Sequence, residues 1–296
     1  MAELADALDS GSSRGNSVDV RLILAAMIHL HRHFAFGDVL WLEPVIRHLA
    51  TRELPINVFT QFPEALENIS CKSLTFNNMF AYKPDHELYH LIYERTPKRH
   101  LLASYFDCAN IANTPLSYPK IYLTAEETKP IVKGKYAVLH LEKNDLNFRN
   151  VYGVDWNEVV QYLQELGLKI IQLSKSGECI YGTRIEISGW RQMMSLIYRA
   201  SCFIGLDSGP SHIAASFGIP SILVFGAVNP AYRHLPEFRG IFLQKPCEFA
   251  HCYHEVFSSH GQPCRIVGDL GIPPCCQQST QNVLCAIQQL QNHFAI

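Results

Sequence analysis

Residues 203–215 read FIGLDSGPSHIAA, in which an apolar run leads directly into Asp-Ser-Gly and then into a helix-forming segment. The apolar run predicts a buried strand, and Pro210 favours the first turn of a helix. The first N–H groups of a helix have no partners within it, so a phosphate can bind there while Ser208 and Gly209 allow close backbone approach. His212 would face the same site. The simpler alternative is an ordinary capped helix with a half-buried histidine.

Short β-branched runs alternate with longer amphipathic segments on both sides of this stretch, which indicates a parallel α/β architecture. Asp155 is expected to cap a helix that ends at Gly167. The C-terminal part of the chain is therefore expected to contain strands at 137–140, 169–173, 202–205 and 221–225, and helices at 156–166, 190–200 and 210–217.

The N-terminal part of the chain repeats this alternation. A helix is expected over 39–50, and Pro44 within it either kinks the helix or marks its true start. Strands are expected at 27–30, 56–60 and 88–92, and a further helix at 100–112.

The segment 113–135 is rich in Pro, Lys and Glu and is expected to link two doubly wound domains. We expect a disordered leader at 1–17, an N-terminal domain at 18–130, and a C-terminal domain at 131–296 that includes a Cys-rich segment at 247–285. Because ligands of open parallel sheets bind at the carboxyl ends of the strands, the site is expected in a cleft between the two domains.

A second corner between a strand and a helix reads FGDVL at 36–40. Gly37 permits a tight turn, and Asp38 would project toward the cleft. A carboxylate at this place can act as general base on an acceptor hydroxyl if it lies within hydrogen-bond reach. The alternative is that Asp38 only caps the helix that follows.

The overall composition is that of a soluble globular protein, with 296 residues, 48% hydrophobic residues and a net charge of −2. This near-neutral charge excludes a polybasic nucleic-acid binder. The longest apolar run, at 22–28, is far shorter than the roughly 20 residues that a membrane span needs. Residues 1–17 also lack the basic-then-apolar order of a secretory signal, so we expect a cytoplasmic protein without a membrane span.

Cysteines cluster near the C-terminus, although disulfides are rare in a reducing compartment. Four thiolates from one irregular segment would close a tetrahedral site for zinc or iron. The candidate ligands are Cys247, Cys252, Cys264 and one of the adjacent pair Cys275 and Cys276. The alternative is that these residues are buried free thiols around a C-terminal extension.

Both corners are similar to segments of the family-9 glycosyltransferases, the heptosyltransferase family. The first match is Gly37-Asp38-Val39-Leu40 with Pro44, and the second runs from Asp207 to Pro230. The second match follows the pattern D-[ST]-G-x-x-H-x-A-A, then G-x-P, then F-G-x-x-x-P. The resemblance covers residues 27–294 and implies a GT-B fold, in which two Rossmann-like domains face each other across the active site.

The resemblance also implies roles for individual residues at the two corners. Asp38 would be the catalytic base that deprotonates the acceptor hydroxyl. Asp207, Ser208, Gly209 and His212 would surround the diphosphate and the sugar of the donor.

Two further basic residues are candidates for the donor site. Arg149 lies seven residues before Trp156, which resembles the position of a family Lys or Arg that grips the diphosphate. The alternative is that Arg149 is a surface cation in a loop. After the strand at 137–140, where relatives usually have small hydroxyl residues, Lys143 would offset the acidic Glu142 beside a diphosphate.

The expected activity is transfer of a sugar, with inversion, from a nucleotide-diphosphate donor to the hydroxyl of an acceptor saccharide or protein. The resemblance suggests ADP-heptose as donor and no catalytic divalent cation. The autotransporter heptosyltransferase subgroup carries a four-cysteine iron site, which implies structural iron or zinc here. One alternative is a non-catalytic, metal-stapled scaffold that binds a nucleotide or a protein partner, and another is a thiol-based metal sensor. Assembly into a homo-oligomer is left open.

Overall fold

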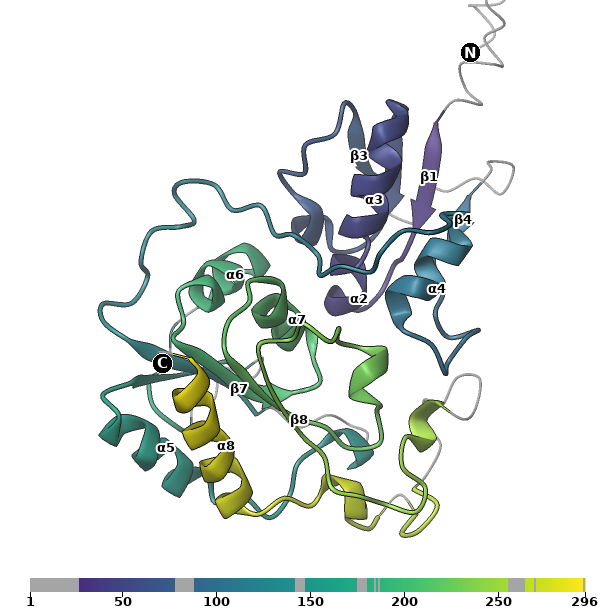
Figure 1. Cartoon of the computed structure of the whole chain (residues 1–296). Coiled ribbons are helices and arrows are strands. Elements are labelled where there is room, and N and C mark those ends of the chain that lie inside the picture. Colours follow the sequence, from purple (N-terminus) through teal and green to yellow (C-terminus); the bar gives the residue numbers. More distant parts are fainter. Residues whose placement is uncertain are drawn as a thin grey trace, which may run out of the picture.

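The computed structural model describes residues 27–77, 88–141, 147–174, 180–183, 185, 187–254, 264–268, 270–294 and 296 (Figure 1). The expected leader and Lys143 lie outside the described residues. Two parallel sheets organise the chain: the N-terminal half runs from β1 to α4, and the C-terminal half runs from β5 to α8. No helix of the described part is long and apolar enough to cross a membrane.

The described strands of the C-terminal half form a five-stranded parallel sheet in the order β6-β5-β7-β8-β9. Alternate residues of the strands point to opposite faces. Ala137 and Leu139 of β5 pack in a different apolar cluster from Tyr136 and Val138 of the same strand. Both faces are therefore covered. The strands are β5 (Tyr136–His140), β6 (Lys169–Gln172), β7 (Cys202–Leu206), β8 (Ser221–Val224) and β9 (Gly240–Leu243).

Helices cover both faces of this sheet. Helices α5 and α8 pack together on one face, and α6 and α7 lie on the face that turns toward the N-terminal half (Figure 1). The side chain of Asp155 caps α5 by accepting a hydrogen bond from Asn157 N (2.9 Å), and Gly167 adopts a positive φ of 79° just past its end, as expected. The bounds are α5 (Trp156–Glu165), α6 (Trp190–Tyr198), α7 (Gly209–Ser216) and α8 (Thr280–His293).

The described strands of the N-terminal half form a smaller parallel sheet in the order β3-β2-β1-β4. Strand β4 pairs with β1 only at Leu30 and His31, so it is shorter than the strand expected at 88–92. The strands are β1 (Ile28–His31), β2 (Ile56–Phe59), β3 (Leu74–Asn77) and β4 (Tyr89–His90).

The helix expected over 39–50 is two helices, α2 (Phe36–Leu40) and α3 (Glu43–Leu49). Pro44 lies in the first turn of α3, where its missing N–H costs nothing, so the second of the two alternatives is correct. Helix α4 (Leu101–Cys108) begins after His100, whose Nδ1 accepts a hydrogen bond from Leu102 N (3.2 Å). It is shorter than the helix expected at 100–112.

The connection between the two halves contains neither helix nor strand over residues 113–135. The buried carboxylate of Glu43 fixes its first part, because it accepts hydrogen bonds from Lys120 N (3.0 Å) and the Tyr122 hydroxyl (2.9 Å). Arg47 forms an ion pair with the same carboxylate (3.0 Å).

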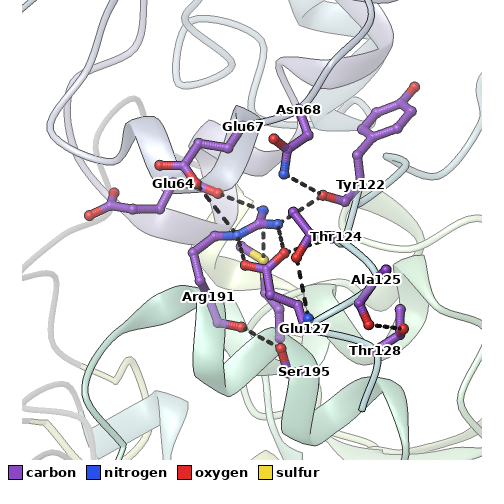
Figure 2. A network of polar contacts seen from close by, with 11 residues as sticks. Glu64, Glu67, Asn68, Tyr122, Thr124, Ala125, Glu127, Thr128, Arg191 and Ser195 are labelled. Carbon is purple, nitrogen blue, oxygen red and sulfur yellow. Dashed lines mark hydrogen bonds and ion pairs between the residues drawn. The ribbon is translucent and has the colours of Figure 1, made fainter.

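Arg191 of α6 binds the second part of the connection (Figure 2). Its guanidinium donates to both carboxylate oxygens of Glu127 (2.7 and 2.6 Å) and to the carbonyl of Tyr122 (2.8 Å). It also donates to the carbonyl of Glu64 (3.2 Å) and lies 3.6 Å from the carboxylate of Glu67. We call these groups the Arg191 clamp. Because Glu64 belongs to the N-terminal half, the clamp joins both halves and the connection.

Candidate active site

The N-terminal ends of α2 and α7 meet where the two halves pack against each other (Figure 1). A Cβ atom on Gly37 would lie 2.8 Å from Cδ2 of His212 and 3.2 Å from Cα of Gly209. Only a glycine at position 37 therefore allows this approach. The structure thus brings together the two corners that the sequence singled out, since α2 follows β1 and α7 follows β7.

Asp38 lies inside the first turn of α2 and does not cap it. The N-cap position belongs to Ala35, which has a positive φ of 63° and forms no side-chain cap. The alternative that Asp38 is a helix cap is therefore wrong. Its carboxylate instead forms an ion pair with the guanidinium of Arg32, and only 14% of the side chain is exposed.

Arg32 follows β1 directly and lies between two carboxylates. Besides its ion pair with Asp38, it donates two hydrogen bonds to Glu94, at 2.8 and 3.0 Å. Its guanidinium also lies over the ring of Tyr93, at 4.9 Å. Burial alone would lower the pKa of Arg32, but Tyr105, Asp38 and Glu94 outweigh it and raise the pKa, so the cation persists. Arg32 thus holds the Asp38 carboxylate in one orientation.

Asp207 lies at the carboxyl end of β7 and is buried. A nitrogen of Arg149 donates to its carboxylate at 2.7 Å and to its carbonyl at 3.1 Å. Burial opposes ionisation of Asp207, but the guanidinium groups of Arg149 and Arg233 outweigh it and lower the pKa to about 2. The pair is therefore fully charged at neutral pH.

Arg149 is the last residue of the short 3₁₀ turn Asn147–Arg149, and only 21% of its side chain is exposed. The alternative that it is a surface loop cation is therefore wrong. Within the described residues, its buried Nε has no hydrogen-bond partner. A buried N–H of a cation without an acceptor carries an energetic penalty, which an anionic ligand would relieve.

Ser208 precedes α7 as its N-cap residue. Its N–H donates to the Ser211 hydroxyl (3.1 Å), and its own hydroxyl lies 3.1 Å from Nδ1 of His140 at the end of β5. The start of α7 is thus fixed to the neighbouring strand. With Gly209 adding no side chain, the first turn presents backbone N–H groups in the manner of an anion site.

His212 is buried on α7 and contacts the N-terminal half. The indole Nε1 of Trp41 donates a hydrogen bond to His212 Nδ1 at 3.2 Å. The imidazole also stacks on His234, with ring centroids 4.9 Å apart. Burial lowers the pKa of His212 to about 4, so the ring is neutral at neutral pH.

Arg233 is a buried residue of this region that no sequence motif indicates, and it lies just after the F-G-x-x-x-P segment. Its guanidinium is buried and lies 4.5 Å from the ring centre of Tyr93 and 5.8 Å from that of Tyr253. Burial would lower its pKa, but Tyr93, Asp207 and Asp38 raise it, so its charge is retained. No carboxylate within the described part of the chain forms an ion pair with it.

The candidate metal ligands lie in the irregular segment between β9 and α8. Cys276 is completely buried, and its sulfur is 3.9 Å from that of Cys275. Burial raises the pKa of Cys252, and nearby Cys275, Cys264 and Cys247 raise it further, so these thiols share one neighbourhood. However, no group of three or more His, Cys, Asp or Glu residues in the described part could hold a metal ion as placed.

Residues 189–238 match the model of glycosyltransferase family 9 (heptosyltransferase). This segment runs from α6 past β8 and contains Asp207, His212 and Arg233.

Two curated proteins match part of the chain. The chain is 30% identical over 154 residues to the autotransporter heptosyltransferase Aah of Escherichia coli. The aligned residues make up 48% of this chain and 34% of that protein. The chain is 28% identical over 120 residues to the autotransporter heptosyltransferase BAHTCr of Citrobacter rodentium, which covers 37% of this chain and 25% of the relative. The chain thus spans about a third or less of the length of these relatives.

Solved structures match nearly the whole chain. The iron-containing dodecameric glycosyltransferase TibC from enterotoxigenic E. coli superposes with a TM-score of 0.67 at 15% identity, over 90% of this chain and 77% of that one. TibC in complex with ADP-D-beta-D-heptose superposes with a TM-score of 0.66 at 15% identity, over 90% of this chain and 76% of that one. At this identity the match shows the fold, and it confirms the predicted GT-B architecture. In fold, and in sequence over residues 189–238, this chain resembles glycosyltransferase family 9, the heptosyltransferase family.

Proposed function

We propose that this chain is an inverting glycosyltransferase that moves a heptose from a nucleotide-diphosphate donor, ADP-heptose, to an acceptor hydroxyl. The observation that carries the proposal is the contact between α2, which bears Asp38, and the start of α7, beside the Asp207–Arg149 pair. A base and an anion site thus meet at one interface. The likeness to TibC, whose structure was solved with ADP-D-beta-D-heptose, supports the choice of donor.

In this proposal, the donor diphosphate lies on the N-terminal end of α7. Asp207 holds Arg149 by one nitrogen, which leaves the unpartnered Nε of that guanidinium for a phosphate oxygen. The N–H groups beside Ser208 and Gly209 supply neutral donors to the same group. These charges stabilise the negative charge that develops on the leaving diphosphate, so the proposal needs no catalytic divalent cation.

Asp38 is the proposed general base on the acceptor side. It would take the proton of the acceptor hydroxyl as that oxygen attacks the anomeric carbon of the sugar. The bond from that carbon to the diphosphate then breaks on the opposite face, which inverts the configuration. Arg32 and Glu94 orient the carboxylate for this step.

We further propose that the acceptor is a saccharide or a protein hydroxyl bound by the N-terminal half, in a domain bounded by residues 18–130. The protein would act in the cytoplasm and assemble from identical chains. The dodecameric state in the name of TibC supports such an assembly. Lys143 remains a proposed contact of the donor.

A structural metal is the last part of the proposal. Sulfur from Cys247, Cys252, Cys264 and one of the pair Cys275 and Cys276 is the donor set that zinc or iron prefers. Burial, and then Cys275, Cys264 and Cys247, raise the pKa of the Cys252 thiol, which supports a common neighbourhood for these residues. The ion would hold this segment in place and take no part in transfer.

The test of the metal is elemental analysis of protein purified without a histidine tag. We expect about one equivalent of iron or zinc per chain, and a lower melting temperature after chelation, because binding energy at such sites is also folding energy. Cys252→Ser should abolish metal retention, whereas Cys285→Ser on α8 serves as control. Metal-free protein with an unchanged melting temperature would refute this part.

The test of the activity is Asp38→Asn. We expect sugar transfer to fall by at least about 100-fold, while calorimetric affinity for ADP changes little, because the carboxylate acts on the acceptor. Asp107→Asn is the matched control, since Asp107 pairs with Arg99 on the exposed side of α4. ADP binding without any turnover of the wild type would instead favour a nucleotide-binding scaffold.

A further inference from the structure

We infer that Trp41 is a positioning residue that fixes the tautomer of His212, so that the donor site gains a neutral N–H group at Nε2 only when the two halves are packed together. This inference deepens the proposed function and rests on it for the identity of the ligand, a nucleoside diphosphate. The tautomer itself follows from the contacts of the described residues alone.

The two rings differ in their hydrogen-bonding chemistry. An indole nitrogen always carries its hydrogen and can only donate. Because Trp41 Nε1 lies 3.2 Å from Nδ1 of His212, that Nδ1 must be the acceptor and carry a lone pair. A neutral imidazole has one hydrogen, which must then be on Nε2. Among the described residues, Nε2 has no hydrogen-bond partner of its own.

Both rings are packed against neighbouring aromatic side chains. Trp41 is completely buried between α2 and α3, with its ring edge against His100 at 5.1 Å and tilted against Tyr118 at 5.6 Å. His212 is stacked on His234, whose Nδ1 lies 3.5 Å from the Tyr118 hydroxyl. The geometry of the hydrogen bond is therefore set by packing from both halves.

The hydrogen bond crosses the interface between the two halves. Trp41 belongs to the N-terminal half and His212 to α7 of the C-terminal half. When the halves separate, Nδ1 loses its donor and the ring can adopt either tautomer. In the Nδ1–H form, Nε2 would carry a lone pair in place of a hydrogen and could not donate to a phosphate oxygen. Packing of the N-terminal half against α7 thus fixes the tautomer of His212 before the ligand binds.

The first measurement is the tautomer itself, by NMR of the full chain labelled with ¹⁵N in histidine. We expect His212, assigned from the signal lost in His212→Gln, to show a protonated Nε2 and a bare Nδ1. In Trp41→Phe, which keeps an aromatic ring, the signals should move toward a mixture of tautomers. Trp190→Phe is the matched control, because Trp190 stacks on Phe36 at 3.8 Å across the same interface and should leave the tautomer unchanged.

The second measurement is the affinity for ADP by calorimetry. We expect Trp41→Phe to bind about 3- to 10-fold more weakly, the effect of one net hydrogen bond. His212→Gln places an amide N–H near the position of Nε2, whereas His212→Asn places it near Nδ1. The Gln variant should therefore retain more affinity than the Asn variant, and Trp41→Phe should cost little when added to His212→Gln.

These outcomes separate the inference from the proposed function. A wild type with the proton on Nδ1, or a Trp41→Phe variant with unchanged tautomer and affinity, would overturn the inference. Equal affinities of the Gln and Asn variants would also contradict it. Failure of the wild type to bind ADP would refute the proposed donor, while the NMR result would still decide the tautomer.

Discussion

Two of the contacts that join the halves within the described residues differ in kind. At the contact between α2 and α7, Gly37, Trp41 and His212 meet without any charged pair, and the two rings are buried. At the Arg191 clamp, one guanidinium binds carboxylates and carbonyls of both halves and the connection, and its partner Glu67 is 44% exposed (Figure 2).

This difference separates two tasks. Packing at α2 and α7 depends on the shapes of the two surfaces, and the repulsion between their atoms rises steeply at short distance. It therefore fixes how closely the two corners of the site approach. The clamp depends on charge, which solvent and protons can reach, so its strength varies with pH and salt. The candidate site lies on the contact that solution conditions affect least.

Gly37→Ala should have the largest effect, because it breaks the packed contact. The new Cβ would lie 2.8 Å from a ring carbon of His212, so the halves must move apart or the ring must shift. We expect a loss of about 1–3 kcal/mol in the free energy of unfolding. Thermal unfolding should show the loss of stability, and calorimetry should show the effect of the shifted halves on ADP binding.

The control for this change is Gly209→Ala, on the opposite side of the same contact. A Cβ there would have its nearest neighbour at 3.5 Å, which is ordinary van der Waals contact. Its melting temperature should stay near that of the wild type. If Gly37→Ala unfolded at the same temperature as the wild type, the close packing of the two helices would not set the spacing of the halves.

Arg191→Met tests the clamp and should have the second largest effect. It keeps much of the side-chain volume but removes the guanidinium donor. Within the described residues, Glu127 then keeps only the N–H of Thr124, and the carbonyl of Tyr122 only the amide of Asn68. We expect a loss of about 1–2 kcal/mol in unfolding free energy, and only partial rescue by Arg191→Lys, because an ammonium lacks the planar fork.

The matched control is Arg99→Met, which removes an exposed ion pair with Asp107. Such pairs contribute little, so thermal unfolding should change by less than about 0.5 kcal/mol. Similar losses in the two variants would show that the clamp behaves as an ordinary surface pair.

Lowering the pH should weaken the Arg191 clamp and so distinguish it from the packed contact. We expect this loss of stability to be smaller than the losses caused by Gly37→Ala and Arg191→Met. Hydrogen bonds from Arg191 lower the pKa of Glu127 from 4.5 to about 2. Because the pKa of this carboxyl group is lower in the folded than in the unfolded state, its full contribution to stability is present above pH 4.5. The contribution declines as the pH falls toward 2. Because Glu127 is partly open to solvent, we expect about 1 kcal/mol.

The measurement is denaturant unfolding between pH 6 and pH 3 for the wild type and Glu127→Gln. The wild type should lose more stability than the variant over this range. Glu126→Gln, whose carboxylate pairs with Lys129 on the surface, should follow the wild type. Parallel curves for Glu127→Gln and the wild type would contradict the pKa assignment.

Sequence alone could predict the C-terminal half well, because its signals are local. The Asp155 cap, the glycine after α5 and the corner at Asp207–Gly209 lie within a few residues of what they determine. The split of the first long helix was ambiguous, since Pro44 is compatible with a kink or a start. The edge strand β4 is short because its length depends on its pairing with β1.

The partners of the site residues could not be predicted, because they come from distant parts of the chain. Arg32 pairs with a carboxylate 62 positions away, and Trp41 with a ring 171 positions away. Nothing in the neighbourhood of Arg233 indicates that it will lie buried against Tyr93 of the other half. Such contacts follow from how the halves pack.

The anchored connection has a kinetic consequence. Glu43 holds it to the N-terminal half as far as Tyr122, and Arg191 holds it to the C-terminal half at the carbonyl of Tyr122 and at Glu127. The two anchors therefore overlap at Tyr122, and hydrogen bonds between Thr124 and Glu127 close the turn that follows, so the connection has little free length. Such a short tether keeps one half at high effective concentration around the other, so each opening is followed by rapid reassembly of the same site.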